Sequence, residues 1–318
     1  MHLKLVIQYD GTNFAGSQLQ APGRGRTVQG EVEAALAHIA GCTVRVALAG
    51  RTDSGVHALG QVASLDFPTR PRLDTPQAVQ KALNGLLPPD LAVVQAEEAP
   101  PGFHARYSAH SRAYRYLLWN CPHPAPLLAR YSLHVPRQLD VQAMGEAAAL
   151  LVGTHDFAAF AGQGLGAGID MDEVAWAGQS EQGAGSSTTR TVYLARVLVL
   201  DPSASPWAWG APTPGFHAGQ QAGQKGANIA TQTQTHGRLV AVDIVANAFL
   251  PQMVRTIVGT LLDIGYGKRT VQDMTEIIHS RDRRRAGQTA KPHGLCLLWV
   301  SYNSHDMGHH TNGVPDRI

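Results

Sequence analysis

The chain has 318 residues, of which 44% are hydrophobic and only 16% are charged, and its formal net charge is +2. These values describe a soluble globular protein of two domains, and no stretch is long and apolar enough to cross a bilayer. The three cysteines are scattered without a CxxC pair, which argues for a reducing compartment and against structural zinc. A strand is expected from residue 3 with no secretory signal before it, so we expect a cytoplasmic protein.

In the first hundred residues, hydrophobic periodicity predicts the element order βαββαβ. The strands are expected at residues 3–9, 43–48, 61–67 and 91–97, and the helices at residues 28–39 and 75–83. The rest of the chain repeats this order, with one further helix at residues 271–280. Its strands are expected at residues 111–119, 191–200, 238–246 and 295–302, and its main helices at residues 141–151 and 251–264. We therefore predict two α+β domains, residues 1–104 and 105–302.

Two segments rich in Gly and Gln interrupt the second half, at about residues 162–187 and 201–236, and a flexible tail is expected at residues 303–318. Their composition cannot support a core, so we expect surface loops. Three histidines of the tail have the helical spacing of metal ligands: His305, His309 and His310. A solvated tail is the better interpretation, because nothing beside them in sequence would orient them as ligands.

The connection between the second and third predicted strands contains Gly50-Arg51-Thr52-Asp53-Ser54-Gly55 and is too long for a tight hairpin. A long loop held by a rigid sheet is a common place for reactive groups. Arg51 would favour the ionised form of Asp53, which a nucleophile needs and a general acid does not. The local sequence alone still favours an Asx-turn or a helix cap, since Asp-Ser-Gly is ordinary turn chemistry.

Acidic residues are absent from residues 99–139, although about three would be expected from the 24 acids of the whole chain. The same segment holds five arginines: Arg106, Arg112, Arg115, Arg130 and Arg137. A GC-rich genome would explain why arginine outnumbers lysine, but it would not explain the missing acids. This distribution indicates a nucleic-acid partner, because the planar guanidinium suits phosphates and base edges.

Aromatic residues are interleaved with these arginines. On the strand expected at residues 111–119, Tyr114 and Tyr116 share one face and Arg115 lies on the other. A ring could therefore face a base while arginine reaches phosphate. Burial in the core is the alternative for both tyrosines. The segment Phe103-His104-Ala105-Arg106-Tyr107 shows the same interleaving of basic and aromatic residues, and the alternative for His104 is a loop histidine whose hydrogen bonds are made within the protein.

The helix expected at residues 251–264 begins with Pro251 and is apolar on nearly all sides, so we expect it to be buried. Arg255 is the exception in this helix. A buried guanidinium requires a partner carboxylate, and Asp53 is chemically suitable. A snorkelling side chain or a local structural ion pair is the alternative.

The remaining polar motifs are less specific. Asp10-Gly11 after the first strand is a turn signature. Four arginines form a basic cluster: Arg281, Arg283, Arg284 and Arg285. A solvated helix end and a contact with RNA are equally good interpretations of this cluster. The sequence contains no P-loop, no Rossmann glycine pattern and no Cys/His metal-ligand spacing, so no cofactor and no metal is expected.

Taken together, several segments resemble the tRNA pseudouridine synthase A family. The matches span almost the whole chain: Tyr9-Asp10-Gly11, Gly50-Arg51-Thr52-Asp53, Gly55-Val56-His57, Phe103-His104-Ala105-Arg106, Tyr114-Arg115-Tyr116, Asn247-Ala248-Phe249, Met253-Val254-Arg255 and Pro292-His293-Gly294-Leu295. The resemblance implies two ferredoxin-like α+β domains, with mainly antiparallel sheets, that face a central RNA-binding cleft. It also implies a homodimeric isomerase that converts uridine to pseudouridine at positions 38, 39 and 40 of the tRNA anticodon stem-loop, without metal or cofactor.

The roles of the family's site residues carry over to matching positions of this chain. Asp53 matches the nucleophile, whose attack breaks the N-glycosidic bond before C5 of the turned base bonds to the sugar. Tyr114 matches a tyrosine that stacks on the target base, Arg255 the arginine paired with the nucleophile, and Arg51 the arginine that helps to flip the nucleotide. Further substrate contacts are expected from the motifs above: His57, His104, Arg106, Arg112 and Arg115.

One motif departs from the family pattern. Members usually have Gly-Trp-Gln-Arg-Gln after the first strand, whereas this chain has Gly16-Ser17-Gln18-Leu19-Gln20. We expect that loop to touch RNA, so Ser17 and Leu19 bear on substrate affinity or on position preference.

Two other function classes stay open. A glycosidase or nucleosidase would need a second carboxylate about 5 to 10 Å from Asp53, and Asp10 is the only other loop acid nearby in sequence. A non-catalytic RNA-binding module would keep the basic segment, and it predicts that Asp53→Ala leaves RNA binding and activity intact.

Overall fold

The structure is a computed structural model, and it describes residues 1–21, 23–162, 187–200 and 237–303. The structural statements that follow concern these residues. Nearly all of the two Gly/Gln-rich segments lies outside them, and so does the tail with His305, His309 and His310.

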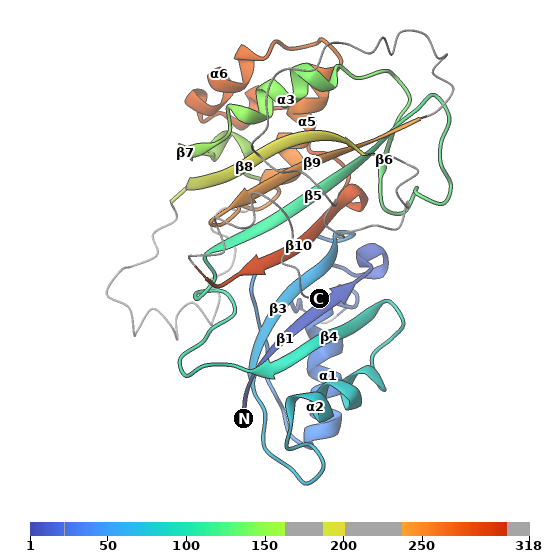
Figure 1. The fold of residues 1–318 in the computed structure, drawn as a ribbon, viewed down its shortest axis with the longest axis vertical. Coiled ribbons are helices and arrows are strands. Elements are labelled where there is room, and N and C mark those ends of the chain that lie inside the picture. Colours follow the sequence, from blue (N-terminus) through green and yellow to red (C-terminus); the bar gives the residue numbers. More distant parts are fainter. Residues whose placement is uncertain (22, 163–186, 201–236, 304–318) are drawn as a thin grey trace, which may run out of the picture.

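A mostly antiparallel sheet runs through both halves of the described chain (Figure 1). Its ten strands follow the path β4-β1-β3-β10-β5-β9-β8-β7, with β2 paired to β3 and β6 paired to β5. The strands of the first half are β1 (His2–Tyr9), β2 (Ala47–Leu48), β3 (His57–Asp66) and β4 (Leu91–Glu98). Those of the second half are β5 (Ser111–Asn120), β6 (Leu133–Val135), β7 (Gly153–Asp156), β8 (Thr189–Leu200), β9 (Arg238–Ala246) and β10 (Leu295–Ser301).

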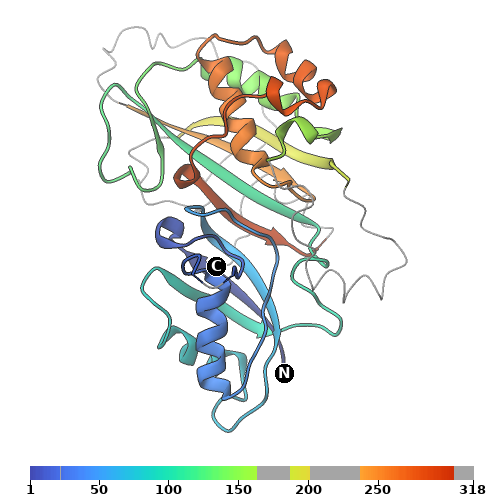
Figure 2. The ribbon, with the colours of Figure 1, turned by 180° about the vertical axis from the view of Figure 1, so that it is seen from behind.

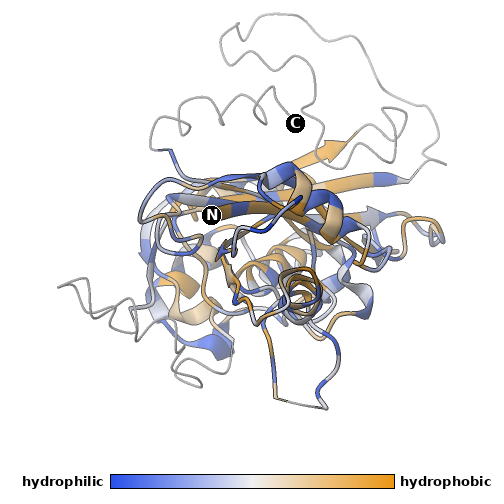
Figure 3. Cartoon of the chain, turned by 90° about the horizontal axis from the view of Figure 1, so that it is seen from below, coloured by the Kyte–Doolittle hydropathy of each residue, from blue (hydrophilic) through white to orange (hydrophobic). Residues whose placement is uncertain are grey.

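The helices cover one face of this sheet, as the view from behind and the view from below show (Figures 2 and 3). The first half contributes α1 (Val28–Ala40) and α2 (Pro76–Asn84), and the second half contributes α3 (Val141–Ala149), α5 (Met253–Gly265) and α6 (Gln272–Ser280). Short 3-10 turns complete the described elements: η1 (Gly11–Asn13), η2 (Ala158–Phe160), η3 (Arg283–Arg285) and η4 (Pro292–Gly294). The main hydrophobic core lies between the helices and the sheet and includes residues of both halves.

Local sequence fixes the helix ends. The side chains of Thr27, Thr75 and Asp140 each accept a backbone hydrogen bond at the start of α1, α2 and α3. Gly41, with a left-handed backbone at φ 64°, ends α1. In α5 almost every side chain is buried, so packing rather than intrinsic propensity stabilises this helix.

The expected α+β class and the mainly antiparallel pairing are confirmed, and most predicted elements are present within a few residues. The strand expected at residues 43–48 is reduced to β2, because only two residues pair with β3. The third strand begins at His57 instead of residue 61, so the loop is shorter than expected. The short strands β6 and β7 were not predicted. The division into two ferredoxin-like domains stays a prediction, because the strands of both halves belong to one sheet.

The two halves of the sheet meet where β3 and β10 pair in parallel, with Cys296 opposite His57 and Leu297 opposite Ala58. Gly60 permits this approach, since an added Cβ would lie 2.5 Å from the carbonyl oxygen of Leu298. Parallel strands start at the same end of a sheet. The loop before β3 therefore lies beside η4, which precedes β10.

Candidate active site

A cavity of about 1220 Å³ lies between the two halves of the sheet and is lined by residues of both. This volume exceeds the roughly 300 to 1,000 Å³ of ordinary small-molecule sites, so a nucleotide with part of its backbone has room. Asp53 is the one acid among the described residues that line it. Five arginines line it as well: Arg51, Arg106, Arg112, Arg190 and Arg255. The excess of positive charge suits a polyanion.

Asp53 and Arg255 are in direct contact in this cavity. Arg255 Nη1 donates to Asp53 Oδ2 at 2.7 Å, and Arg255 Nε donates to the carbonyl oxygen of Ala290, also at 2.7 Å. The Arg255 side chain is 14% exposed and the Asp53 side chain 35%, so the pair is shielded on the helix side and open on the cavity side. The predicted pairing is confirmed. Among the described residues, nothing donates a hydrogen bond to the other carboxylate oxygen, Oδ1.

The Asp53 loop (residues 49–56) is held by hydrogen bonds to the residues just before Asp53. Gln61 Nε2 donates to the carbonyl oxygen of Gly50 at 2.8 Å, and a 2.8 Å hydrogen bond joins the hydroxyls of Tyr9 and Thr52. Burial raises the pKa of Tyr9 to about 12, so its hydroxyl stays neutral in this role. The only hydrogen bond of the Asp53 side chain within the described structure is the one from Arg255. The Asx-turn and helix-cap interpretations are therefore wrong for the Asp53 side chain, although the backbone does turn here, with the N–H of Val56 donating to the Asp53 carbonyl oxygen at 3.1 Å.

Ser17, which stands where the family usually has Trp, lies behind the Asp53 loop and is fully buried. Its Oγ accepts from the backbone N–H of Thr52 at 2.8 Å, and its own N–H donates to the Thr52 carbonyl oxygen at 3.1 Å. Its neighbours line the cavity instead: Gly16, Gln18, Leu19 and Gln20. These four residues thus lie at the cavity, where their contact with RNA stays a prediction, whereas Ser17 supports the Asp53 loop.

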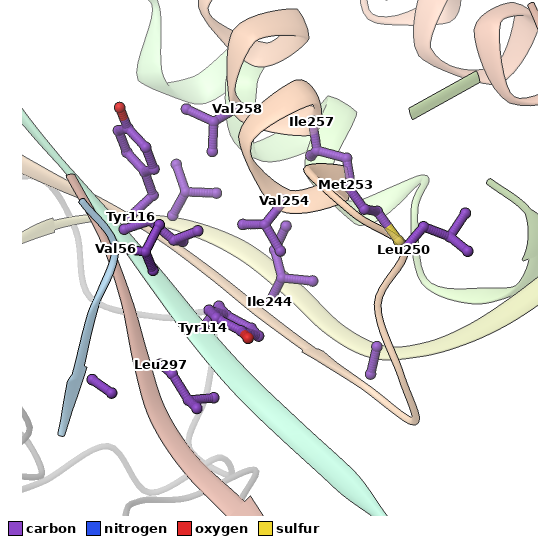
Figure 4. Packing of buried hydrophobic residues seen from close by; sticks show 14 of the residues in the cluster. Val56, Tyr114, Tyr116, Ile244, Leu250, Met253, Val254, Ile257, Val258 and Leu297 are labelled. Carbon is purple, nitrogen blue, oxygen red and sulfur yellow. The ribbon is translucent and has the colours of Figure 1, made fainter. Parts of the chain in front are cut away.

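Tyr114 projects from β5 toward α5 and lines the cavity. It is 7% exposed, and its ring meets that of Phe249 edge-on, with 5.0 Å between the ring centres. Figure 4 shows Tyr114 close to Ile244, Val254 and Leu297. Burial raises its pKa above the ordinary value, so the phenol is neutral at physiological pH. The ring can offer an edge or a face to a base that enters the cavity.

Tyr116 has the alternative role, as a core residue. It is fully buried, and its hydroxyl donates to the carbonyl oxygen of Lys291 at 2.7 Å. The two tyrosines share one face of β5 but lie at different points along the strand, so Tyr116 packs in the core while Tyr114 also reaches the cavity.

Four of the expected substrate-binding residues line the cavity: Arg51, His104, Arg106 and Arg112. His104 Nδ1 accepts from the backbone N–H groups of Arg106 and Tyr107, so this histidine also shapes its own loop. Arg112 is buried, and its guanidinium donates to the carbonyl oxygens of Ala49, Asn247 and Arg106. These bonds tie the Asp53 loop to β5, so Arg112 has a structural role that the sequence does not reveal.

The other two expected substrate-binding residues, His57 and Arg115, do not line the cavity. His57 is buried at the start of β3, where Nδ1 accepts from the backbone N–H of Gly11 at 3.0 Å. Arg115 points to the opposite face of the sheet, where its guanidinium binds both carboxylate oxygens of Asp243 at 2.7 and 3.0 Å. The strand alternation that brings Tyr114 to the cavity directs Arg115 away from it.

Asp10 lies outside the cavity lining and is engaged elsewhere. Its Oδ2 accepts from Arg130 Nη1 at 3.2 Å and from the Tyr131 hydroxyl at 3.1 Å. Its Oδ1 accepts from Thr12 and lies 3.2 Å from His57 Nδ1. Burial acts to raise the pKa of Asp10, but these hydrogen bonds and the histidine lower it overall. Asp10-Gly11 is therefore more than a turn, and its carboxylate is not placed to work with Asp53.

The basic cluster at the end of α6 is largely neutralised by acids. Arg281 pairs with Asp156, Arg284 with Asp282, and Arg285 with Glu276. The described residues contain no group of three His, Cys, Asp or Glu side chains that could hold a metal ion. None of the described helices is long and apolar enough to cross a membrane.

Two cavity residues escape sequence reasoning. Arg190 is the second residue of β8, close to the first Gly/Gln-rich segment, and only the polar run Ser187-Thr188-Thr189 marks its position. Gln252 has a left-handed backbone, at φ 59°, directly before α5. A non-glycine residue in this conformation is strained and is often found at functional sites. No sequence pattern predicts this strain, because Pro251 alone suggests an ordinary helix start.

The site's chemistry narrows the class of protein. An arginine-lined cavity suits the phosphates of a nucleic acid, and a lone carboxylate bound by an arginine suits nucleophilic catalysis better than paired acid–base catalysis. Fold and site thus define an α+β enzyme that modifies RNA.

Comparisons with known proteins specify the family. The model of the tRNA pseudouridine synthase family matches residues 5–108 and 147–303. A tRNA pseudouridine synthase A from Chloroflexus aurantiacus is 42% identical over 300 residues, covering 94% of this chain and 88% of the relative. The enzyme of that name from Roseiflexus castenholzii is 39% identical over 301 residues, covering 95% and 90%. That from Moorella thermoacetica is 36% identical over 300 residues, covering 94% and 99%.

The chain therefore belongs to the tRNA pseudouridine synthase family, whose members are isomerases that convert uridine to pseudouridine in tRNA.

Proposed function

We propose that this chain isomerises uridine to pseudouridine in tRNA, with Asp53 as the nucleophile. The contact between Asp53 and Arg255 carries the proposal, because it holds one carboxylate in an arginine-lined cavity between the two halves of the sheet. The carboxylate oxygen that Arg255 does not hold, Oδ1, is the attacking atom.

The reaction begins when the target nucleotide leaves its stack, since a stacked and paired uridine hides the reacting atoms. Arg51 is exposed at the cavity, where it can enter the vacated position. Tyr114 then supports the flipped base. Asp53 attacks the target nucleotide, the N-glycosidic bond breaks, and the detached base turns within the cavity. C5 bonds to the sugar as the bond to Asp53 breaks, the C5 proton is released, and N1 gains a proton.

Arg255 has two functions in this scheme. Its Nη1 holds one oxygen of the Asp53 carboxylate through a charge-assisted hydrogen bond, and its second hydrogen bond, to Ala290, fixes the direction of the guanidinium. A carboxylate held by one oxygen keeps the other in a defined position, which lowers the entropic cost of the attack.

The substrate positions and the assembly follow from the family resemblance. The chain modifies positions 38, 39 and 40 of the anticodon stem-loop, acts as a homodimer, and works in the cytoplasm, where its tRNA substrate is found. The arginines of the cavity support the tRNA assignment, because they supply charge for the RNA backbone.

A glycosidase or nucleosidase is the second candidate, and the cavity disfavours it. Such an enzyme would need a second carboxylate close to the first. Asp53 is the only acid among the described residues that line the cavity, and the carboxylate of Asp10 accepts hydrogen bonds from Arg130 and Tyr131. A non-catalytic RNA-binding module is the third candidate, but it would have no use for an arginine that orients one carboxylate oxygen.

Incubation with tRNA tritiated at C5 of uridine tests the proposal. Each isomerisation releases one C5 hydrogen, so wild-type protein should release tritium to water, and the new pseudouridines should map to positions 38, 39 and 40. Absence of release from any tRNA contradicts the enzyme assignment. Release with modification elsewhere contradicts only the assigned positions.

A further inference from the structure

Arg190 is a cavity arginine that the proposed reaction does not use. It is the second residue of β8, and its Nη1 donates to the carbonyl oxygens of Ser187 and Thr189 at 2.8 and 2.6 Å. Its Nε is buried without a hydrogen-bond partner, and the described residues offer no partner to Nη2 either. Nε and Nη2 form one edge of the guanidinium, and this edge binds an oxyanion through two parallel hydrogen bonds.

A buried donor of a cation that has no acceptor costs free energy in the folded protein, on the order of 1–3 kcal/mol. Residues that retain such a cost often have a ligand that removes it. No acid in the described structure forms an ion pair with Arg190, so no described carboxylate supplies the missing acceptor.

Two further arginines lie near Arg190 in the cavity. Arg112 is held by backbone carbonyls, which do not neutralise its charge. Burial lowers the pKa of Arg112, and the charges of Arg106 and Arg190 lower it further. Burial also lowers the pKa of Arg190 itself. Positive charge therefore accumulates at this part of the cavity, although each arginine remains protonated.

We propose that Arg190 binds a phosphate of the RNA backbone next to the flipped nucleotide, through its Nε and Nη2 edge, with Arg106 and Arg112 supplying supporting charge. A phosphodiester provides two oxygens with the spacing that this edge requires. Arg190 is thus a positioning residue, and the inference rests on the proposed function because it takes tRNA as the ligand.

Arg190→Gln removes the charge and the fork. Because the lost contact is made equally in the ground and transition states, KM for tRNA should rise roughly 10-fold, while kcat changes by less than about two-fold. The slope of log K against log salt should become shallower by about one unit, since one fewer counterion is released. Arg190→Lys keeps the charge without the fork, so it should restore the salt slope and only part of the affinity.

Arg196→Gln is the matched control. Arg196 lies on the same strand but outside the cavity lining, and Asp243, its partner, remains paired with Arg115. The melting temperature, KM and salt slope of the Arg196→Gln variant should stay close to those of wild-type protein. Arg190→Gln should also melt close to wild type, because the change removes no ion pair among the described residues, and the loss of its two hydrogen bonds to backbone carbonyls is offset by removal of the unpaired buried donor.

A tRNA with single neutral methylphosphonate linkages identifies the phosphate. One linkage beside the target uridine should weaken binding to wild-type protein and should cause no further loss with Arg190→Gln. The assignment would be overturned if the salt slope of Arg190→Gln equalled that of wild-type protein. It would also be overturned if, at every linkage tested, the methylphosphonate weakened tRNA binding to Arg190→Gln as much as to wild-type protein. Wild-type protein that binds tRNA but releases no tritium would refute the proposed function and leave the binding test of Arg190 intact.

Discussion

Arg255 and Asp53 lie 202 residues apart in the chain and meet at 2.7 Å. Arg255 extends from the first turn of a buried helix, so its guanidinium has few possible directions. The bond to Ala290 uses Nε and leaves Nη1 aimed at Asp53. A lysine could supply charge here, but its three N–H donors share one nitrogen, so it could not reproduce contacts made from two separate nitrogens, Nε and Nη1.

Replacement of Arg255 by leucine should abolish tritium release while tRNA affinity stays within about three-fold of wild type. The variant loses the cation that orients Asp53 and leaves this carboxylate partly buried without a partner. Asp53 is about one-third exposed, so solvent screening limits the loss in the free energy of unfolding to about 1–2 kcal/mol. Filter binding and chemical denaturation measure the two quantities.

Arg255→Lys is the comparison for this variant and should recover a measurable fraction of the activity. The role of Arg255 would be disproved if the leucine variant lost tRNA affinity in step with its activity, since that result would make it an RNA-binding residue.

At this scale, the sequence predicts a partner only where chemistry leaves little choice. Arg255 stands alone in an apolar helix, and an arginine there needs an acid. Ser17 and Arg190 give no comparable signal, because a small polar residue and an arginine in a polar run fit any surface segment. For Arg115, strand alternation predicts that its side chain lies on the other face of β5 from Tyr114. Alternation does not predict which of the two faces lines the cavity.

The Asp53 loop is the element on which the site depends. It is held from below by Ser17 and Tyr9, from β3 by Gln61, and from β5 by Arg112. η1 adds steric support, because the backbone of Gly11 lies directly against that of Val56. Attack by Oδ1 requires correct placement within a fraction of an ångström, so small shifts of this loop should affect kcat more than binding.

Gly11→Ala tests this support. The added Cβ would overlap the Val56 carbonyl oxygen, and both groups belong to the backbone, so the loop or η1 must move. We expect kcat to fall by roughly 100-fold, with tRNA affinity much less affected. Steady-state kinetics on tRNA separates the two effects.

Gly145→Ala is the control for the same chemical change, because a Cβ there meets open space in α3. Alanine is the better helix former, so this control should be more stable by about 0.5–1 kcal/mol and fully active. A Gly11→Ala protein with wild-type kcat would show that the loop does not need this contact.

Elements with local signals were predicted well. Hydrophobic periodicity places α1, α2 and α3 within about two residues of their observed ends, and the apolar pattern of α5 indicates its burial. β2, β6 and β7 have only two to four residues, too few for an alternating pattern to be recognised. Residues 43–46 alternate like a strand but find no partner, because the pairing of β2 with β3 covers only Ala47 and Leu48.

At the scale of the whole molecule, one continuous sheet brings the two parts of the active site together. β3 carries the Asp53 loop at its start, and β10, its parallel neighbour, belongs to the half that contributes Arg255. Sequence alone could not predict this pairing, because strand contacts between distant segments leave no local pattern. His57 lies at the junction, with Nε2 at 3.2 Å from the carbonyl oxygens of Arg130 and His293.

This junction should make stability depend on pH. Burial lowers the pKa of His57, an effect that the charge of Asp10 only partly offsets, and burial also lowers the pKa of His293. In the unfolded chain both histidines titrate near the ordinary value of about 6.5. Protonation therefore favours the unfolded chain, so the free energy of unfolding should be constant above about pH 7 and fall as the pH is lowered from about 6.5 to 5.5.

Urea denaturation at pH 7.5, 6.5 and 5.5 measures this dependence. His57→Asn can keep an acceptor for the N–H of Gly11 but cannot be protonated, so its stability should change less between these pH values. His38→Asn, at an exposed position of α1, should match the wild-type dependence. Equal pH dependence in wild-type and His57→Asn proteins would refute the role of His57 at the junction.

The central claim is that Asp53 is the nucleophile, and Asp53→Asn tests it most directly. Asparagine preserves size and can still accept from Arg255, but its amide oxygen is a poor nucleophile. With tRNA tritiated at C5 of uridine, this variant should bind with wild-type affinity and release no label, while Asp66→Asn, at an exposed position of β3, should be fully active. Tritium release by Asp53→Asn at a rate comparable to wild type would contradict the account.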